Sequence, residues 1–112
     1  MSRDTDLYVR DMLDACRRIV AYRGAVTEAV AFGEGQTRDA LLWNLLVLGE
    51  AAKQVPAHVT DTHPGIAWRK IAGFRDVLAH AYFDVDRLIL RDVVDNKVPA
   101  LIAQLEAVLD RS

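Results

Sequence analysis

Cysteine is nearly absent from this sequence, and long apolar runs are missing altogether. The single thiol, Cys16, excludes a disulfide framework and a zinc site of several thiolates within one chain. No stretch approaches the ~20 apolar residues that cross a membrane, and the polar N-terminal residues lack the apolar core of a signal peptide. We therefore expect a cytoplasmic protein that makes no use of a membrane, with Cys16 as a small buried hydrophobe.

An excess of one sign of charge is also lacking. The 112 residues include 14 Lys and Arg against 16 Asp and Glu, which gives a formal net charge of −2. The overall composition therefore does not point to a nucleic-acid-binding protein, and any phosphate site has to be a local basic patch. A hydrophobic content of 52% with 27% charged residues indicates one globular domain that spans residues 1–112.

Residues that bind metals or nucleotide phosphates are few. His58, Asp61 and His63 share one proline-containing loop, but two histidines and one aspartate in a single loop are a weak ligand set. Gly33 and Gly35 are too few for a phosphate-binding loop, and no Lys followed by Ser or Thr comes after them. The sequence therefore predicts neither a metal nor another cofactor.

Apolar residues recur at helical spacing along nearly the whole chain. This pattern predicts an all-α fold, an antiparallel four-helix bundle with an additional short helix. Residues 56–65 are expected to form a loop, and residues 83–86 a turn that ends in an aspartate N-cap. Pro99 is expected to kink or divide the last helix. The predicted helices span residues 4 or 5 to 23, 37 to 55 with Thr37 as N-cap, 66 to 82, and 87 to 109.

The third predicted helix, residues 66–82, carries the residues with catalytic potential. Its apolar residues form one stripe centred on Ile71, and Arg75 and Tyr82 align along an edge of that stripe. His80 falls on the opposite side and therefore faces water or a partner rather than its own core. Arg75 and His80 are separated by ~140° around the axis and ~7.5 Å along it, so they converge only if the helix loosens or a second chain contributes.

The spacing of these residues resembles a known family. An arginine, a polar residue, then His80 and Tyr82 at the end of an amphipathic helix resemble the HEPN superfamily, and specifically HepT-like toxins, the partners of minimal nucleotidyltransferase antitoxins of the MntA type. Residues 44–53, residues 63–64 together with 68–73, and residues 82–86 extend the resemblance over nearly the whole chain. One position departs from the pattern, because Asp76 stands where HepT-like proteins often have asparagine.

The resemblance implies a metal-independent endoribonuclease toxin of a type VII toxin–antitoxin system. Arg75 would hold the phosphate and His80 would transfer protons, which suits a guanidinium and an imidazole that titrates near neutrality. Asp76 would support them and could hydrogen-bond His80. Arg69 and Lys70 would guide the RNA backbone. The antitoxin is expected to silence the protein by AMPylation of Tyr82.

The function and the oligomeric state are the two points that the residues leave open. The alternative to an endoribonuclease is a non-catalytic helical adaptor that binds a nucleotide or a partner protein. A homodimer with a shared cleft is expected, because the second predicted helix is apolar around most of its circumference and Gly73 lies on the same side as His80. Glu50, a single carboxylate in that second helix, suits a polar contact at an interface. Trp43 and Trp68 are interpreted as packing residues rather than base-stacking platforms.

Overall fold

The computed structural model describes residues 2–110, and within that range the fold is all-helical, without a strand, as predicted. No helix in this range is long and apolar enough to cross a membrane. A 3-10 turn, η1, covers Tyr82–Asp84, and a π-helical turn, η2, covers Val93–Lys97. The α-helices are α1 (Arg3–Gly24), α2 (Glu28–Phe32), α3 (Gln36–Gln54), α4 (Ala57–Thr60), α5 (Trp68–Ala81), α6 (Arg87–Asp92) and α7 (Val98–Asp110).

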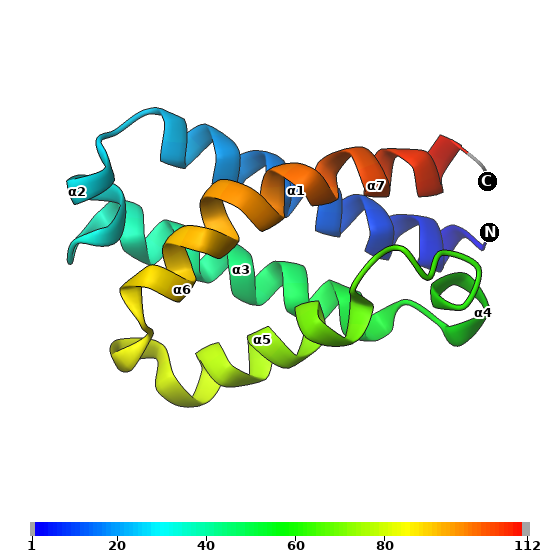
Figure 1. Cartoon of the computed structure of the whole chain (residues 1–112). Coiled ribbons are helices and arrows are strands. Elements are labelled where there is room, and N and C mark those ends of the chain that lie inside the picture. The colour runs from blue at the N-terminus through cyan, green and yellow to red at the C-terminus, as the bar shows by residue number, and fades with distance from the viewer. Residues whose placement is uncertain (1, 111–112) are drawn as a thin grey trace.

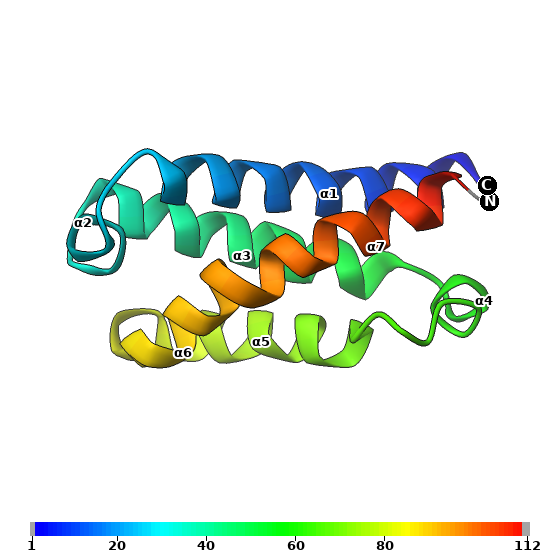
Figure 2. The same cartoon turned by 45° about the horizontal axis from the view of Figure 1, so that its top comes forward.

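The long helices run alternately up and down the molecule. Helix α1 packs on α3 and on α7, and α3 also packs on α5, which lies at one edge of the fold (Figure 1). Turned by 45°, the molecule shows α6 and α7 as a continuous rod that passes in front of α3 (Figure 2). Helix α5 packs mainly on α3, and its packing against α7 is sparse. The helix that carries the predicted motif therefore has one principal neighbour.

The start of α3 differs from the prediction. Gly35, rather than Thr37, is the N-cap, and Thr37 lies within the first helical turn. Gly35 has a φ of 149°, a backbone conformation that residues with a side chain rarely adopt. The chain therefore turns at Gly35, and the helix begins directly after it.

The segment between α3 and α5 is more structured than the predicted loop. It contains the short helix α4, and α5 begins at Trp68 rather than at residue 66. The indole Nε1 of Trp68 donates a hydrogen bond to the carbonyl oxygen of His63, 3.0 Å away, which fixes the segment against the start of α5. Trp68 is buried, so its interpretation as a packing residue is confirmed.

The C-terminal rod, where Pro99 is expected to kink or divide the helix, stays continuous, but its winding changes just before the proline. Asp86 caps α6, because its Oδ1 accepts hydrogen bonds from the backbone N–H groups of Leu88 and Ile89. Proline cannot donate to the carbonyl one turn before it, and the backbone immediately before Pro99 is a π-turn, in which the N–H of Val98 donates to the carbonyl of Val93.

The core lies mainly between α1, α3 and α7. Cys16 belongs to it, and burial raises the pKa of its thiol to about 12, which confirms its expected role as a buried hydrophobe. Helix α5 contributes only Trp68 and Leu78 to the buried set. The largest fully buried side chains are Met12, Ile19, Leu41, Leu42, Leu78, Leu90 and Leu105.

Candidate active site

A glycine allows α3 and α5 to approach closely at the centre of the predicted motif. A Cβ atom on Gly49 would lie 2.2 Å from the Cβ of Arg75 and 3.1 Å from the carbonyl oxygen of Ile71. Neither atom belongs to a flexible side-chain end, so any larger residue at position 49 would push the two helices apart. Gly49 therefore places Arg75 directly on the surface of α3.

The guanidinium of Arg75 is held by two carboxylates. Its Nε lies 3.0 Å from Oε2 of Glu50 on α3, and its NH1 nitrogen lies 3.3 Å from Oδ1 of Asp76. The side chain is 32% exposed. Because a guanidinium has five N–H donors, these two contacts leave its NH2 nitrogen available for an anion.

Asp76 also binds a second cation. The Nζ of Lys53 lies 2.5 Å from the same Oδ1 that contacts Arg75. The hydrogen bond from Lys53, with a smaller contribution from Arg75, lowers the pKa of the Asp76 carboxyl. Glu50, Lys53, Arg75 and Asp76 form what we call the charge cluster, in which two positive and two negative side chains join α3 to α5.

His80 is oriented by the backbone of the same aspartate. Its Nδ1 lies 2.7 Å from the carbonyl oxygen of Asp76. A carbonyl only accepts, so Nδ1 carries the proton, and in the neutral ring Nε2 holds a free lone pair. The expected contact between His80 and Asp76 therefore involves the main chain, while the carboxylate turns toward Lys53 and Arg75. His80 is exposed, in agreement with its predicted position away from the core.

Tyr82 lies at the end of α5, beside a hollow that also contains Arg75. It is half-buried, and its ring meets that of Phe83 edge-on, with the centroids 5.4 Å apart. The hollow has a volume of about 360 Å³, and Trp43, Val47, Glu50 and Ala79 also line it. Arg75 and Tyr82 thus share one surface, whereas His80 lies farther around the helix.

Trp43 corrects one interpretation from the sequence. Its side chain is 65% exposed on the outer face of α3, so within this chain it does not pack. The reason is that α3 buries its other faces against α1 and α5 through residues such as Leu41, Leu42 and Leu45. An exposed indole next to Arg75 is available to a ligand or to a second chain.

The two basic residues predicted to guide RNA do not join the charge cluster. Arg69 and Lys70 are exposed at the start of α5, and Lys70 lines a different hollow, on the side of α5 that faces α7. The sequence prediction missed Lys53 and assigned Glu50 only to an interface. Their spacing of three residues, which places an acid and a base on one helical face, was the signal that could have found them.

No group of three His, Cys, Asp or Glu side chains within residues 2–110 is arranged to hold a metal ion. His58 lies in α4 and His63 follows it, both on the segment between α3 and α5. The polar groups of the site are instead the two carboxylates that contact Arg75, the lysine that contacts Asp76, and the imidazole of His80 on the carbonyl of Asp76. Such groups can hold a phosphate and move protons.

Comparison with known proteins gives a consistent result. A family model described as "Ribonuclease HepT-like" matches residues 12–108. A protein of Thermococcus cleftensis named "Probable ribonuclease HepT" is 32% identical over 106 residues, which cover 95% of this chain and 96% of that protein. A protein of Methanocaldococcus jannaschii, whose name assigns it provisionally to the RNases, is 30% identical over 107 residues, or 96% of this chain and 88% of that protein.

A third relative, from Caldanaerobacter subterraneus subsp. tengcongensis, also has a provisional RNase name. It is 30% identical over 105 residues, which cover 93% of each chain. No solved structure matches this chain. The family match and the near-complete coverage of the relatives show that this chain belongs to the HepT-like ribonuclease family.

Proposed function

We propose that this protein is a metal-independent endoribonuclease in which Arg75 binds the scissile phosphate and His80 transfers protons. The observation that carries this proposal is the double role of Asp76. Its carboxylate contacts the guanidinium of Arg75, and its carbonyl accepts from Nδ1 of His80, which leaves Nε2 free to act as a base. One residue thus orients both groups.

The proposed reaction needs no cofactor. Nε2 of His80 takes the proton of a ribose 2′-hydroxyl, the 2′-oxygen forms a bond to phosphorus, and the bond from phosphorus to the 5′-oxygen breaks. The leaving 5′-oxygen takes up a proton from water, the other product strand ends in a 2′,3′-cyclic phosphate, and Nε2 of His80 returns its proton to the solvent. The free NH2 nitrogen of Arg75 stabilises the negative charge that develops on the phosphoryl oxygens.

We propose a homodimer with a shared cleft as the active form. The charge cluster is neutral by itself, so one chain offers an RNA strand little net attraction. The exposed Trp43 marks an uncovered apolar face beside Arg75, and nothing lies within 4 Å of a Cβ built on Gly73. A two-fold axis near this surface would bring two copies of Arg75 and of His80 to one cleft and supply the missing positive charge.

We further propose that the protein is a toxin controlled by a nucleotidyltransferase antitoxin that AMPylates Tyr82. The position of Tyr82 supports this, because it lines the same hollow as Arg75. An AMP group attached there would add bulk and negative charge beside the guanidinium and would compete with RNA for it. Mass spectrometry after co-expression with a cognate nucleotidyltransferase should find the added mass on Tyr82 and not in Tyr82→Phe.

A non-catalytic adaptor is the second candidate, and one observation favours it. Two carboxylates already contact the guanidinium of Arg75, and a bound phosphate has to compete with them. An adaptor would use the same surface to bind a nucleotide or the partner nucleotidyltransferase, without cleaving. The experiment below separates the two functions.

The test is RNA cleavage by the purified protein in the presence of EDTA. We expect cleavage by the wild type, and a loss of at least about 100-fold in His80→Ala and in Arg75→Ala, with helical content unchanged. His58→Ala is the matched control, because His58 is an exposed histidine on α4 and should cleave like the wild type. Cleavage that needs a divalent ion would contradict the metal-free mechanism. RNA binding without cleavage would favour the adaptor.

A further inference from the structure

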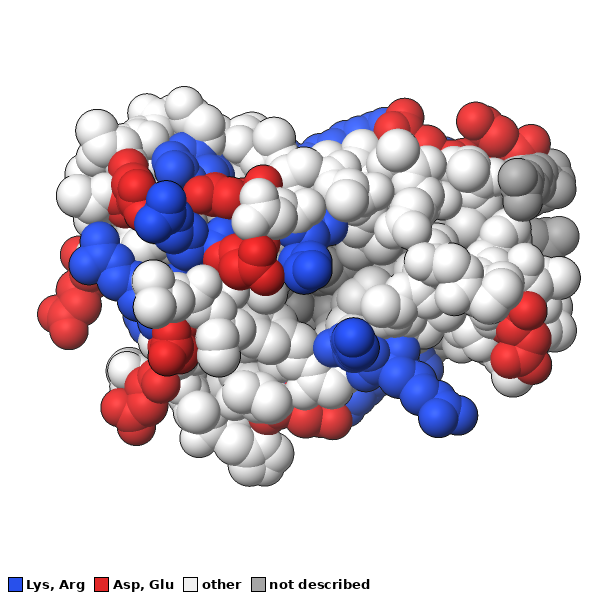
Figure 3. Space-filling model, viewed as in Figure 1, with Lys and Arg blue, Asp and Glu red and all other residues white. Residues whose placement is uncertain are grey.

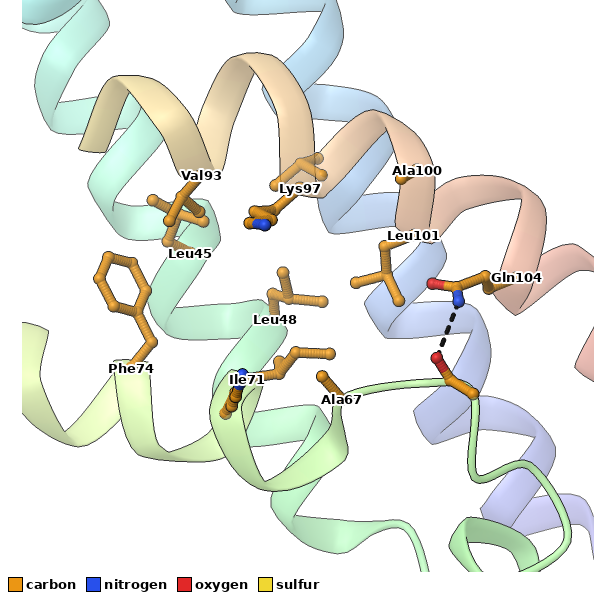
Figure 4. Close-up of a pocket in the computed structure, with 13 residues that line it drawn as sticks. Leu45, Leu48, Ala67, Ile71, Phe74, Val93, Lys97, Ala100, Leu101 and Gln104 are labelled. Atoms are coloured by element: carbon orange, nitrogen blue, oxygen red, sulfur yellow. Dashed lines mark hydrogen bonds between the residues drawn. The ribbon is translucent and has the colours of Figure 1, made fainter. Parts of the chain in front are cut away.

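The side of α5 that faces α7 borders a second hollow. It has a volume of about 380 Å³ and lies between α3, α5, the π-turn η2 and α7. Figure 4 shows Leu48, Ile71 and Leu101 pointing into this space from three different helices. Ile71 and Phe74, which the helical pattern assigns to the core stripe, are only half-buried because they face it. The hollow is thus a gap in the packing of the helix that carries the motif.

The walls of this hollow offer almost no hydrogen-bonding groups. Its lining is mainly leucine, isoleucine, valine, alanine and phenylalanine side chains. The one side-chain amide, Gln104, already donates to the carbonyl oxygen of Gly65 across one end, over 3.0 Å (Figure 4). A nucleobase placed here would leave its polar edge without partners, which costs free energy in an apolar site. An alkyl chain has no such groups.

Two lysines stand at the rim of the hollow. Lys70 comes from α5 and Lys97 from η2, and neither forms an ion pair with any residue in the range 2–110. Figure 3 shows basic side chains on both sides of the hollow, with uncharged surface between them. The π-turn, a feature often found at functional sites, contributes both Val93 to the wall and Lys97 to the rim.

We propose that this hollow binds a small amphipathic anion. Its apolar chain would lie against Leu48, Ile71 and Leu101, and its acidic head would lie between Lys70 and Lys97. The volume falls within the range of small-molecule sites, roughly 300–1,000 Å³, whose walls are apolar with a few polar groups that fix orientation. The site lies on the α7 side of α5, opposite the charge cluster, so this inference does not depend on the proposed function.

Occupation of the site should stabilise the fold. The ligand would add to the sparse contacts between α7 and α5, and a ligand that binds only the folded state shifts the unfolding equilibrium. The experiment uses decanoate below the concentration at which it forms micelles, with decanol as the uncharged analogue and acetate as the anion without a chain. Calorimetric titration and thermal unfolding of the purified protein are the two readouts.

We expect decanoate to bind with one site per chain and to raise the Tm by several degrees at about ten times its Kd. Acetate should not shift the Tm, and decanol should bind less tightly than decanoate. Lys70→Met and Lys97→Met should each weaken decanoate roughly fivefold and leave decanol unchanged. Arg18→Met removes an exposed cation from α1 and is the control that should bind both compounds like the wild type.

A cavity-filling variant makes the test independent of charge. Ala100 lines the hollow and is exposed, so Ala100→Phe should occupy the space, fold normally and bind neither decanoate nor decanol. Equal affinity for decanoate in the wild type and in the Lys70→Met/Lys97→Met double variant would overturn the proposal. The proposal would also fail if the wild type bound neither decanoate nor decanol. If, in that case, Ala100→Phe had a lower mass than the wild type in light scattering, the hollow would be an interface between copies of the chain.

Discussion

The two sides of α5 are packed in contrasting ways. On the side of α3, Gly49 lets the two helices approach so closely that a side chain at position 49 would overlap Arg75. Three ion pairs also connect the residues of the charge cluster. On the side of α7, a hollow of about 380 Å³ separates the helices, and Ile71 and Phe74 remain half-buried. The same helix is thus fixed along one edge and loose along the other.

The contrast shows which neighbour determines the geometry of the site. Arg75 and Asp76 are positioned by α3, and His80 is positioned through the carbonyl of Asp76. Changes on the α3 side should therefore alter both stability and the site. Changes on the α7 side should alter stability alone, because that side holds no group of the proposed mechanism.

The largest expected difference concerns two apolar residues of α5. Leu78 is fully buried, and Leu78→Ala should lower the free energy of unfolding by about 2–5 kcal/mol. Ile71 is half-buried beside the hollow, so Ile71→Ala should cost about 1 kcal/mol, since it removes less buried surface. Urea unfolding of both variants measures the difference. Equal costs would show that the hollow is filled in solution.

The next prediction compares two glycines: Gly49 lies in the contact between α3 and α5, and Gly73 of α5 lies away from it. Gly49→Ala should destabilise the protein by about 1–3 kcal/mol, because its Cβ would overlap the Cβ of Arg75. It should also reduce RNA cleavage under conditions where the variant is fully folded. Gly73→Ala is the matched control: nothing lies within 4 Å of its Cβ, so the monomer should gain up to about 1 kcal/mol of helix propensity.

The outcome for Gly73→Ala also bears on the proposed dimer. A variant that is more stable as a monomer but fails to dimerise or to cleave would place Gly73 at the interface between copies. If the variant dimerises and cleaves normally, the interface between copies does not include Gly73 and lies elsewhere on α5. Light scattering and cleavage assays on the same sample distinguish these outcomes.

The smallest expected effect is the pH dependence of Asp76. Lys53 lowers the pKa of the carboxyl in the folded state, so the charge cluster contributes stability above the ordinary aspartate pKa of ~3.9. That contribution is lost as the pH falls through the lowered pKa. The wild type should therefore be slightly more stable than Asp76→Asn from pH 7 down to about 4, and the difference should shrink below that. A difference that grows on acidification would contradict this sign.

Sequence patterns predicted the helices well because helical periodicity and caps are local properties. An aspartate of the turn 83–86 is expected as the N-cap, and Asp86 is that cap, since capping acts on a single turn of backbone. Pro99 is expected to kink or divide the last helix, and the winding instead changes to a π-turn directly before it. Thr37 failed as a predicted cap because the turn is decided by Gly35, whose positive φ is not visible in an amphipathic pattern.

The candidate site was only partly predictable, because two of its members depend on packing between helices. Helical spacing predicts that His80 lies outside the core and that Arg75 lies at its edge. Both positions are confirmed, because His80 is exposed and Arg75 is half-buried. It could not show that Glu50 and Lys53 of α3 reach Arg75 and Asp76, because this depends on the close approach at Gly49. Proximity in sequence places Lys70 with Arg69, whereas in the structure Lys70 borders the hollow on the side of α5 that faces α7.

The π-turn η2 holds one residue more than an α-helical turn would hold between the same ends. Deleting one residue between positions 93 and 97 would leave an ordinary α-helical turn between the same ends, so α7 would keep its orientation relative to α6. Leu101 and Leu105 would stay in the core. Deleting one residue from the regular part of α7 would instead turn the residues that follow by ~100° around the helix axis. Homologous chains whose C-terminal rods differ in length by one residue should therefore differ at the π-turn.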